Sequence, residues 1–102
     1  MNGLIELLEN IKARPLMYLG EYNFDRLNCL LTGIHLGYVI TNEVSDYSKS
    51  HKIVLSKRGW NPSSTLVHKD MEKNGLTEKE IVIELLEIEV ETWKCIINKI
   101  SN

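Results

Sequence analysis

The chain has 102 residues, of which 43% are hydrophobic and 25% are charged, a composition typical of one globular domain. We expect a single domain over residues 1–102, because this length is too short for a two-domain enzyme. The formal net charge of −2 excludes an overall electrostatic attraction to nucleic acid or to an anionic membrane, so functional charge has to be sought locally.

The sequence predicts neither a secretory signal nor a membrane span. Acidic residues precede any long apolar run in the N-terminal segment, which lacks the basic region of a signal peptide. The uninterrupted apolar runs are only a few residues long, far short of the roughly 18 that a membrane-spanning helix needs. We therefore expect a cytoplasmic protein.

Hydrophobic periodicity predicts two helices in the first half of the chain. Apolar residues recur at three- and four-residue steps over residues 4–11. Pro15 ends this helix, because the residue before a proline is driven out of the α region. A second helix starts at a cap formed by Asn23 or Asp25 and continues for about 18 residues.

The middle of the chain is predicted to be rich in loops. Between residues 44 and 61, polar and basic side chains surround a short β-prone run at residues 53–55, which is the candidate for a short strand. Pro62 lies early in a short third helix, and Gly75 closes that helix.

The last quarter of the chain predicts a long central helix. Thr77 and Glu80 form a capping box, which opens a helix to about residue 99. Its apolar residues cover more than one stripe, so we expect an all-α fold of about four helices around it, or a helix half-buried across a homodimer. In the second helix, Gly33 and Gly37 predict close packing of another helix within the fold, with an oligomer face as the alternative.

Four glutamates of this last helix are the candidate partner-binding surface. They recur at three- and four-residue steps and so share one exposed ridge: Glu80, Glu84, Glu87 and Glu91. A row of carboxylates on a rigid helix imitates the phosphate array that a basic active site recognises, as an inhibitor of a nuclease does. The alternative interpretation is an ordinary solvated helix face.

The charge of the chain is unevenly distributed. Residues 49–73 carry a net charge of +4, whereas the segments on either side carry −3 each. Basic residues beside an aromatic ring suit phosphate contact and base stacking, so nucleic-acid binding is the alternative function. Its candidate residues are Lys49, Lys52, Lys57, Arg58 and Trp60. A solvated loop that pairs with the acidic residues of its own fold explains the same composition.

No motif for catalysis or metal binding is present in the sequence. His35, His51 and His68 share no helical spacing and no HExxH pattern, and the serines lack a GxSxG elbow. Cys29 and Cys95 have no metal-like spacing and are expected to be small buried hydrophobic residues. We therefore expect a binding protein that uses no cofactor or metal, and not an enzyme.

A segment in the first half of the chain resembles a loose family of small bacterial proteins. Their pattern is a helix, the string R-P-x-M-Y-L-G and a second helix that carries G-Y. Here the pattern is formed by Arg14, Pro15, Met17, Tyr18, Leu19, Gly20, Gly37 and Tyr38. Some members of that family resemble immunity proteins of bacterial toxin systems, so the resemblance implies binding to a toxin domain. From the residues themselves, we expect Met17 and Tyr18 to pack inward, which would make the motif structural.

Overall fold

The computed structural model describes residues 2–42, 47–64 and 66–101. Over these ranges the chain is all-α, as predicted, and contains no strand. The described residues form six helices where about four were expected, because the segments at residues 15–19 and 47–57 are also helical. The helices are α1 (Asn2–Ala13), α2 (Pro15–Leu19), α3 (Phe24–Asn42), α4 (Tyr47–Lys57), α5 (Val67–Lys73) and α6 (Glu78–Ser101).

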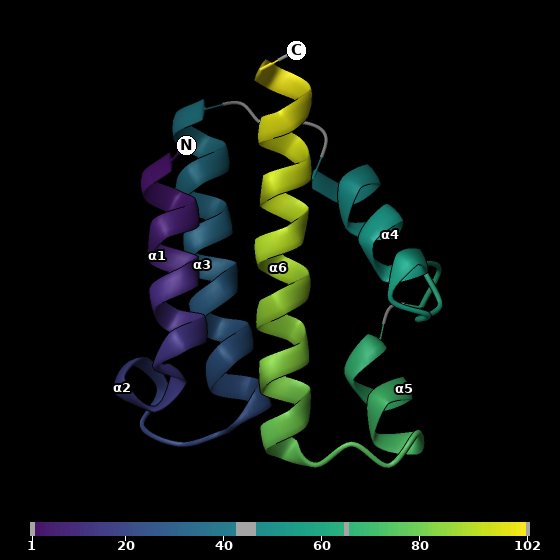
Figure 1. Cartoon of the computed structure of the whole chain (residues 1–102). Helices are drawn as coiled ribbons and strands as arrows, with labels where there is room; N and C mark the ends of the chain where they lie inside the picture. The colour runs from purple at the N-terminus through teal and green to yellow at the C-terminus, as the bar shows by residue number, and fades with distance from the viewer. Residues whose placement is uncertain (1, 43–46, 65, 102) are drawn as a thin grey trace.

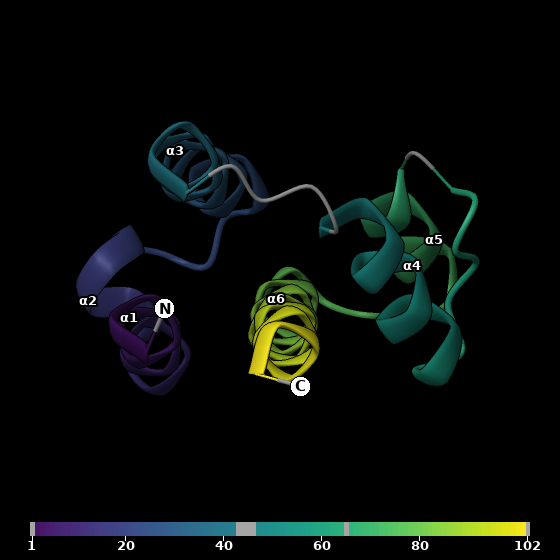
Figure 2. The same ribbon diagram turned by 90° about the horizontal axis from the view of Figure 1, so that it is seen from above.

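The long C-terminal helix α6 lies between two groups of helices. α1, α2 and α3 lie on one side of it, and α4 and α5 lie on the other (Figures 1 and 2). α6 packs against helices of both groups, namely α1, α3, α4 and α5. The expectation of a central last helix is therefore confirmed within a single chain.

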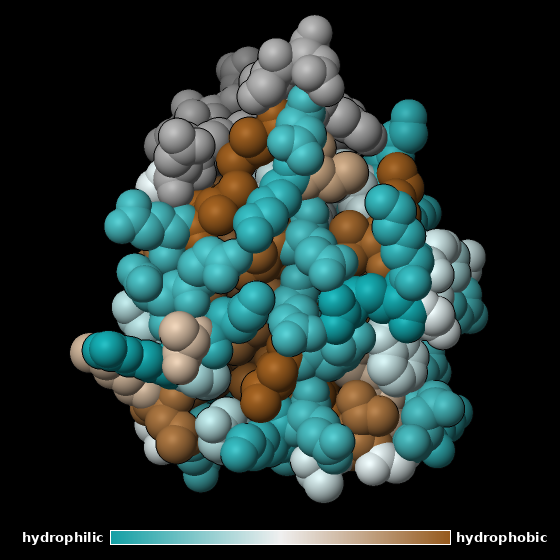
Figure 3. All heavy atoms as spheres, viewed as in Figure 1, coloured by the Kyte–Doolittle hydropathy of each residue, from teal (hydrophilic) through white to brown (hydrophobic). Residues whose placement is uncertain are grey.

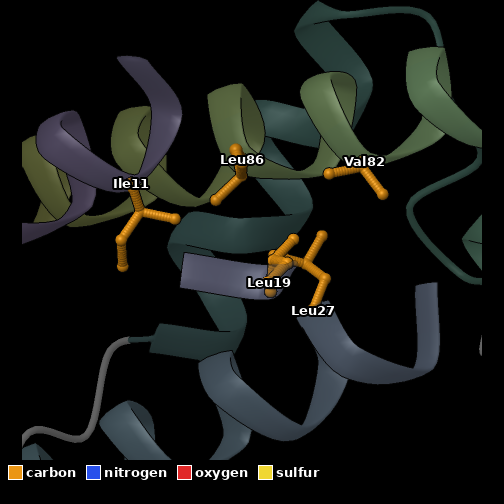
Figure 4. Packing of buried hydrophobic residues seen from close by; sticks show 5 residues of the cluster. All are labelled: Ile11, Leu19, Leu27, Val82 and Leu86. Carbon is orange, nitrogen blue, oxygen red and sulfur yellow. The ribbon is translucent and has the colours of Figure 1, made fainter. Parts of the chain in front are cut away.

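The hydrophobic core is arranged along α6 in three clusters, and each of them contains residues of this helix. One cluster joins α6 to the first three helices, and its side chains point toward one another in Figure 4: Ile11, Leu19, Leu27, Val82 and Leu86. A second joins α6 to α4 and α5, and the third joins it to α1. Because both helix groups bury apolar side chains against α6, this helix is apolar on several sides.

The loop predicted over residues 44–61 is wrong for residues 47–57, which form α4, and so is the predicted strand at residues 53–55. Residues 58–61 are non-helical as predicted, and residues 44–46 lie outside the described residues. Ser50, Val54 and Leu55 are buried; Ser50 and Val54 are four residues apart and share one helix face, and Leu55 follows Val54. Val54 and Leu55 pack in the same cluster as Ile81 and Ile88 of α6. The burial of this face outweighs the β propensity of residues 53–55.

The predicted helix starts are confirmed at two of three places. The Asn23 carboxamide oxygen accepts a hydrogen bond from the Arg26 backbone N–H (3.0 Å). Thr77 and Glu80 form the reciprocal bonds of the capping box, at 3.0 and 3.2 Å. The third helix starts later than predicted, because Pro62 belongs to a turn and α5 begins at Val67.

The prediction that Gly33 and Gly37 admit a closely packed helix is wrong. Both glycines are exposed, and a Cβ built on either would meet no heavy atom of the described chain within 4 Å outside the helix itself. The oligomer-face alternative stays a prediction. Cys29, on the same helix, is exposed rather than buried, and Cys95 is half-buried.

Candidate functional site

Arg58 gathers three of the four predicted ridge glutamates around one guanidinium. Its Nε and Nη2 atoms donate to the two carboxylate oxygens of Glu84, at 2.8 and 2.6 Å. The same group donates to Glu87 and, at 2.7 Å, to Glu91. The indole N–H of Trp60 adds a bond of 2.8 Å to Glu84. The ridge therefore exists, and it is paired with basic and aromatic residues of its own fold.

The Arg58 contacts change the ionisation of the ridge. The hydrogen bond from Arg58 is the main reason that the pKa of Glu84 lies below its usual value, although burial opposes this shift. Three carboxylates share one guanidinium, so the face keeps an excess of negative charge, and Figure 3 shows hydrophilic side chains along this side of α6. Glu80 is held in the capping box, where hydrogen bonds with Thr77 lower its pKa.

The residues predicted to contact nucleic acid are divided by the fold. Arg58 and Trp60 turn onto α6, as the alternative of pairing with the chain's own acidic residues requires. Lys49, Lys52 and Lys57 are exposed on α4. The basic and aromatic residues thus do not form the single open surface that the sequence suggested.

The R-P-x-M-Y-L-G motif lies at the surface, so the prediction that Met17 and Tyr18 pack inward is wrong. Met17 is 73% exposed, Tyr18 43% and Leu16 48%. α2 has only five residues and one inner face, which Pro15 and Leu19 occupy at the i and i+4 positions. The three residues between them must therefore face outward, and hydrophobic atoms are visible over α2 at the lower left of Figure 3.

The end of α2 is fixed by a glycine and an arginine. Gly20 has φ +79°, and its N–H donates to the Leu16 carbonyl oxygen (2.8 Å). The Arg26 guanidinium donates to the Leu19 carbonyl oxygen, also at 2.8 Å. A Cβ at Gly20 would lie 2.9 Å from Nη1 of Arg26, the movable end of a flexible side chain, so it is the left-handed backbone conformation that favours glycine here. The motif presents exposed apolar side chains on a fixed backbone.

A second feature is a cavity of about 360 Å³ between α3 on one side and α4 and α5 on the other. It is lined by all three histidines of the chain, His35, His51 and His68, which come from three different helices. Because they are on different helices, no spacing in the sequence could have grouped them. Leu85, Ile88 and Glu89 of α6 also line the cavity.

Glu89 is the acidic residue of this cavity, and it is only 6% exposed. Its Oε2 accepts a hydrogen bond from the Tyr47 hydroxyl (2.7 Å), and its Oε1 accepts one from the Trp93 indole N–H (3.0 Å). Burial raises the pKa of Glu89 in spite of these bonds. Sequence reasoning missed Glu89, because it does not fall on the steps of the ridge and is enclosed by the buried Ile88 and Val90.

Aromatic and imidazole rings surround this carboxyl group. The rings of His35 and Tyr47 meet edge to face, with centroids 4.4 Å apart. The His51 ring stacks on the Tyr47 ring, with centroids 5.5 Å apart. Burial lowers the pKa of His51, which favours its neutral form. Within residues 2–42, 47–64 and 66–101, no group of three or more histidine, cysteine or acidic residues could hold a metal ion. The arrangement suits hydrogen bonding to a ligand.

Comparison with protein-family models, curated proteins and solved structures finds no match for this chain. The family resemblance of the R-P-x-M-Y-L-G segment therefore stays a prediction. Among the described helices, none has both the length and the apolar character needed to cross a membrane.

Proposed function

We propose that the protein acts by binding another protein, and that the toxin-neutralising role implied by the sequence resemblance is the specific form of this function. The observation that carries the proposal is the exposed apolar surface of α2, formed by Leu16, Met17 and Tyr18 and called the α2 surface below. Contiguous exposed apolar side chains are typical of sites that a protein partner covers.

The fixed backbone of α2 supports this proposal. Pro15 and Leu19 anchor the helix in the core, and Gly20 and Arg26 close its end. A surface that is already ordered loses little conformational freedom when it binds, so more of its contact energy appears as affinity. Tyrosine and methionine are also enriched in the buried centres of protein interfaces.

Charged side chains lie close to this apolar surface. Tyr18 shares a shallow hollow with Asp25 and Arg26, and it shares another with Arg14. Protein interfaces commonly have an apolar centre with charged residues at the edge, where hydrogen bonds set the orientation of the partner. The α2 surface and its neighbours fit this arrangement.

The glutamate ridge has a longer-range role in the proposal. Arg58 neutralises only part of the charge of Glu84, Glu87 and Glu91, so α6 keeps a negative face. Such a face accelerates the approach of a basic partner. The active site of a toxin that binds nucleic acid would be basic in this way. Close contact is assigned to the α2 surface, because its side chains have fewer competing partners within the fold.

The proposal is tested by comparing variants of exposed apolar residues inside and outside the α2 surface. A protein captured by the tagged wild type is purified, and its affinity is measured for wild type, for L16Q/M17Q and for L66Q. L66Q is the control, because the Leu66 side chain is 54% exposed and lies outside the α2 surface. We expect L16Q/M17Q to bind at least tenfold more weakly, a loss of about 1.4 kcal/mol or more, and L66Q to bind like wild type. Equal affinity of all three proteins would contradict the α2 surface as the binding site.

The toxin-neutralising form of the function needs a separate readout. The captured protein is expressed in bacterial cells alone, with the wild-type chain, or with L16Q/M17Q. We expect growth to stop when it is expressed alone, to recover with the wild-type chain and to recover poorly with the variant. A captured protein that never impairs growth would contradict the toxin assignment, while the affinity measurement would still decide the binding site.

A further inference from the structure

The cavity between α3 and α4–α5 holds a buried carboxyl group whose basic neighbour is a histidine, His35, and not a lysine or arginine. Glu89 accepts hydrogen bonds from two neutral donors, Tyr47 and Trp93. No lysine or arginine of the described chain forms an ion pair with it. A buried carboxylate is costly unless it is paired with a positive charge. Two neutral donors meet only part of that requirement.

The shape of the cavity suits a small molecule. Ring pairs bridge the two helix groups at two places along it: Phe24 stacks on His68 with centroids 3.7 Å apart, and His35 meets Tyr47. The volume of about 360 Å³ lies at the lower end of the range for ligand sites, roughly 300 to 1,000 Å³. The ligand must therefore be small.

The lining selects the charge of such a ligand. The described lining residues include no lysine or arginine, and Glu89 is the acidic one among them. Aromatic rings attract a cation through their negative faces, and the carboxylate attracts it directly. An anionic ligand would be repelled by this carboxylate. The remaining walls, including Leu31, Val67 and Leu85, suit an apolar body.

The histidine beside Glu89 adds an unused hydrogen-bonding atom. His35 lines the cavity, and its Nδ1 is buried with no hydrogen-bond partner in the described part of the chain. Buried polar atoms are usually paired with protein, water or ligand. The cavity thus contains more hydrogen-bonding capacity than the surrounding side chains use.

We propose that this cavity binds a small organic amine with an aromatic or apolar body, and that the ammonium group of the ligand pairs with Glu89. This site is separate from the α2 surface, and it does not depend on the proposed protein partner. Pairing with the ammonium group gives Glu89 a full positive charge, where the described chain offers the weaker base His35. The body of the ligand lies among the rings and aliphatic side chains of the walls.

The charge selectivity is tested with three probes that have nearly the same shape. 2-Phenylethylamine, 2-phenylethanol and 3-phenylpropionate are titrated into the protein and followed by ligand-observed NMR and isothermal calorimetry, with tryptamine as a larger amine. We expect saturable binding of at least one amine in the millimolar range or tighter, weaker binding of the alcohol and none of the carboxylate. Failure of both amines to bind, or binding of the anion as tight as that of the amines, would overturn the proposal.

The role of Glu89 is tested with matched variants. E89Q keeps the size of the side chain but removes its charge, and we expect it to bind the amine about tenfold or more weakly. E6Q, which changes an exposed glutamate of α1 outside the cavity lining, is the control and should bind like wild type. L36W keeps Glu89 and narrows the cavity, so it should also weaken binding and serves if E89Q does not fold. Undiminished binding by both E89Q and L36W would place the amine elsewhere.

Discussion

Arg58 and Glu84 form a two-pronged ion pair that joins the residue after α4 to the N-terminal half of α6. The Nε and Nη2 atoms of the guanidinium lie 2.8 and 2.6 Å from the two carboxylate oxygens, and the side chains are 23% and 19% exposed. Paired geometry and partial burial make such a contact stronger than an ordinary surface ion pair. It therefore helps to fix α4 on the central helix.

Loss of Arg58 should destabilise the fold. R58M removes the bonds to Glu84, Glu87 and Glu91 and leaves three carboxylates close together. We expect the free energy of unfolding, measured in urea, to fall by about 1 to 2 kcal/mol, a value reduced from that of fully buried charged bonds because water screens the cluster. The control K57M changes an exposed neighbour and should stay within about 0.5 kcal/mol of wild type.

The contribution of Arg58 should disappear in acid. The pKa of Glu84 is lower in the folded protein than its usual value of 4.5, so the folded state binds fewer protons there than the unfolded state. Stability from this pair is therefore complete above pH 4.5 and is lost as the pH falls through the folded pKa. The difference in unfolding free energy between wild type and R58M should narrow over that range. A difference that stays constant would mean that Arg58 acts through its aliphatic packing.

Truncation of the neighbouring motif residues Tyr18 and Leu19 should affect stability to different extents. Leu19 is 5% exposed and packs in a core cluster, so L19A should cost about 2 to 5 kcal/mol. Y18A should cost less than about 1 kcal/mol, because its ring is 43% exposed. Urea unfolding of the two variants checks this order. A loss of about 3 kcal/mol in Y18A would restore the inward packing that the sequence suggested.

The contribution of Glu89 to the free energy of unfolding should depend on pH in the opposite direction to that of Glu84. Burial raises the pKa of Glu89 above the usual 4.5, so the folded state binds more protons than the unfolded state and stability falls as the pH rises through this window. E89Q removes the titration, and its stability relative to wild type should therefore improve from pH 4.5 toward neutrality. The exposed E6Q variant is the control. Parallel pH profiles of E89Q and wild type would show that burial of Glu89 does not shift its ionisation.

The fold was predicted from the sequence wherever local signals and burial agree. The capping box at Thr77 and the apolar breadth of the last helix correctly indicated α6 and its central place. The β-prone residues 53–55 were misleading, because Val54 and Leu55 are buried against α6 as part of a helix, whereas Ile53 is exposed. Gly33 also misled, since a glycine in a helix indicates freedom to pack closely without showing that anything does.

The site residues were predicted less completely, for reasons of tertiary geometry. The spacing of the glutamates correctly placed them on one face, but no pattern showed that Arg58 would lie at its centre. The apolar character of Met17 and Tyr18 suggested that they lie in the core. In the five-residue helix α2, however, Pro15 and Leu19 occupy the buried face. The cavity joins residues from α3, α4, α5 and α6, and its composition emerges only when these helices are assembled.

The most direct test of the account is photo-crosslinking from the α2 surface inside living cells. A photoreactive phenylalanine derivative is placed at Met17 in one variant and at Leu66 in another, since both positions are exposed. The account predicts that irradiation crosslinks the Met17 variant to one protein partner and that the Leu66 variant forms no such adduct. When the L16Q substitution is combined with the photoreactive residue at Met17, the amount of adduct should fall. An equal adduct from both positions, or none from Met17 while the partner is captured, would contradict binding through the α2 surface.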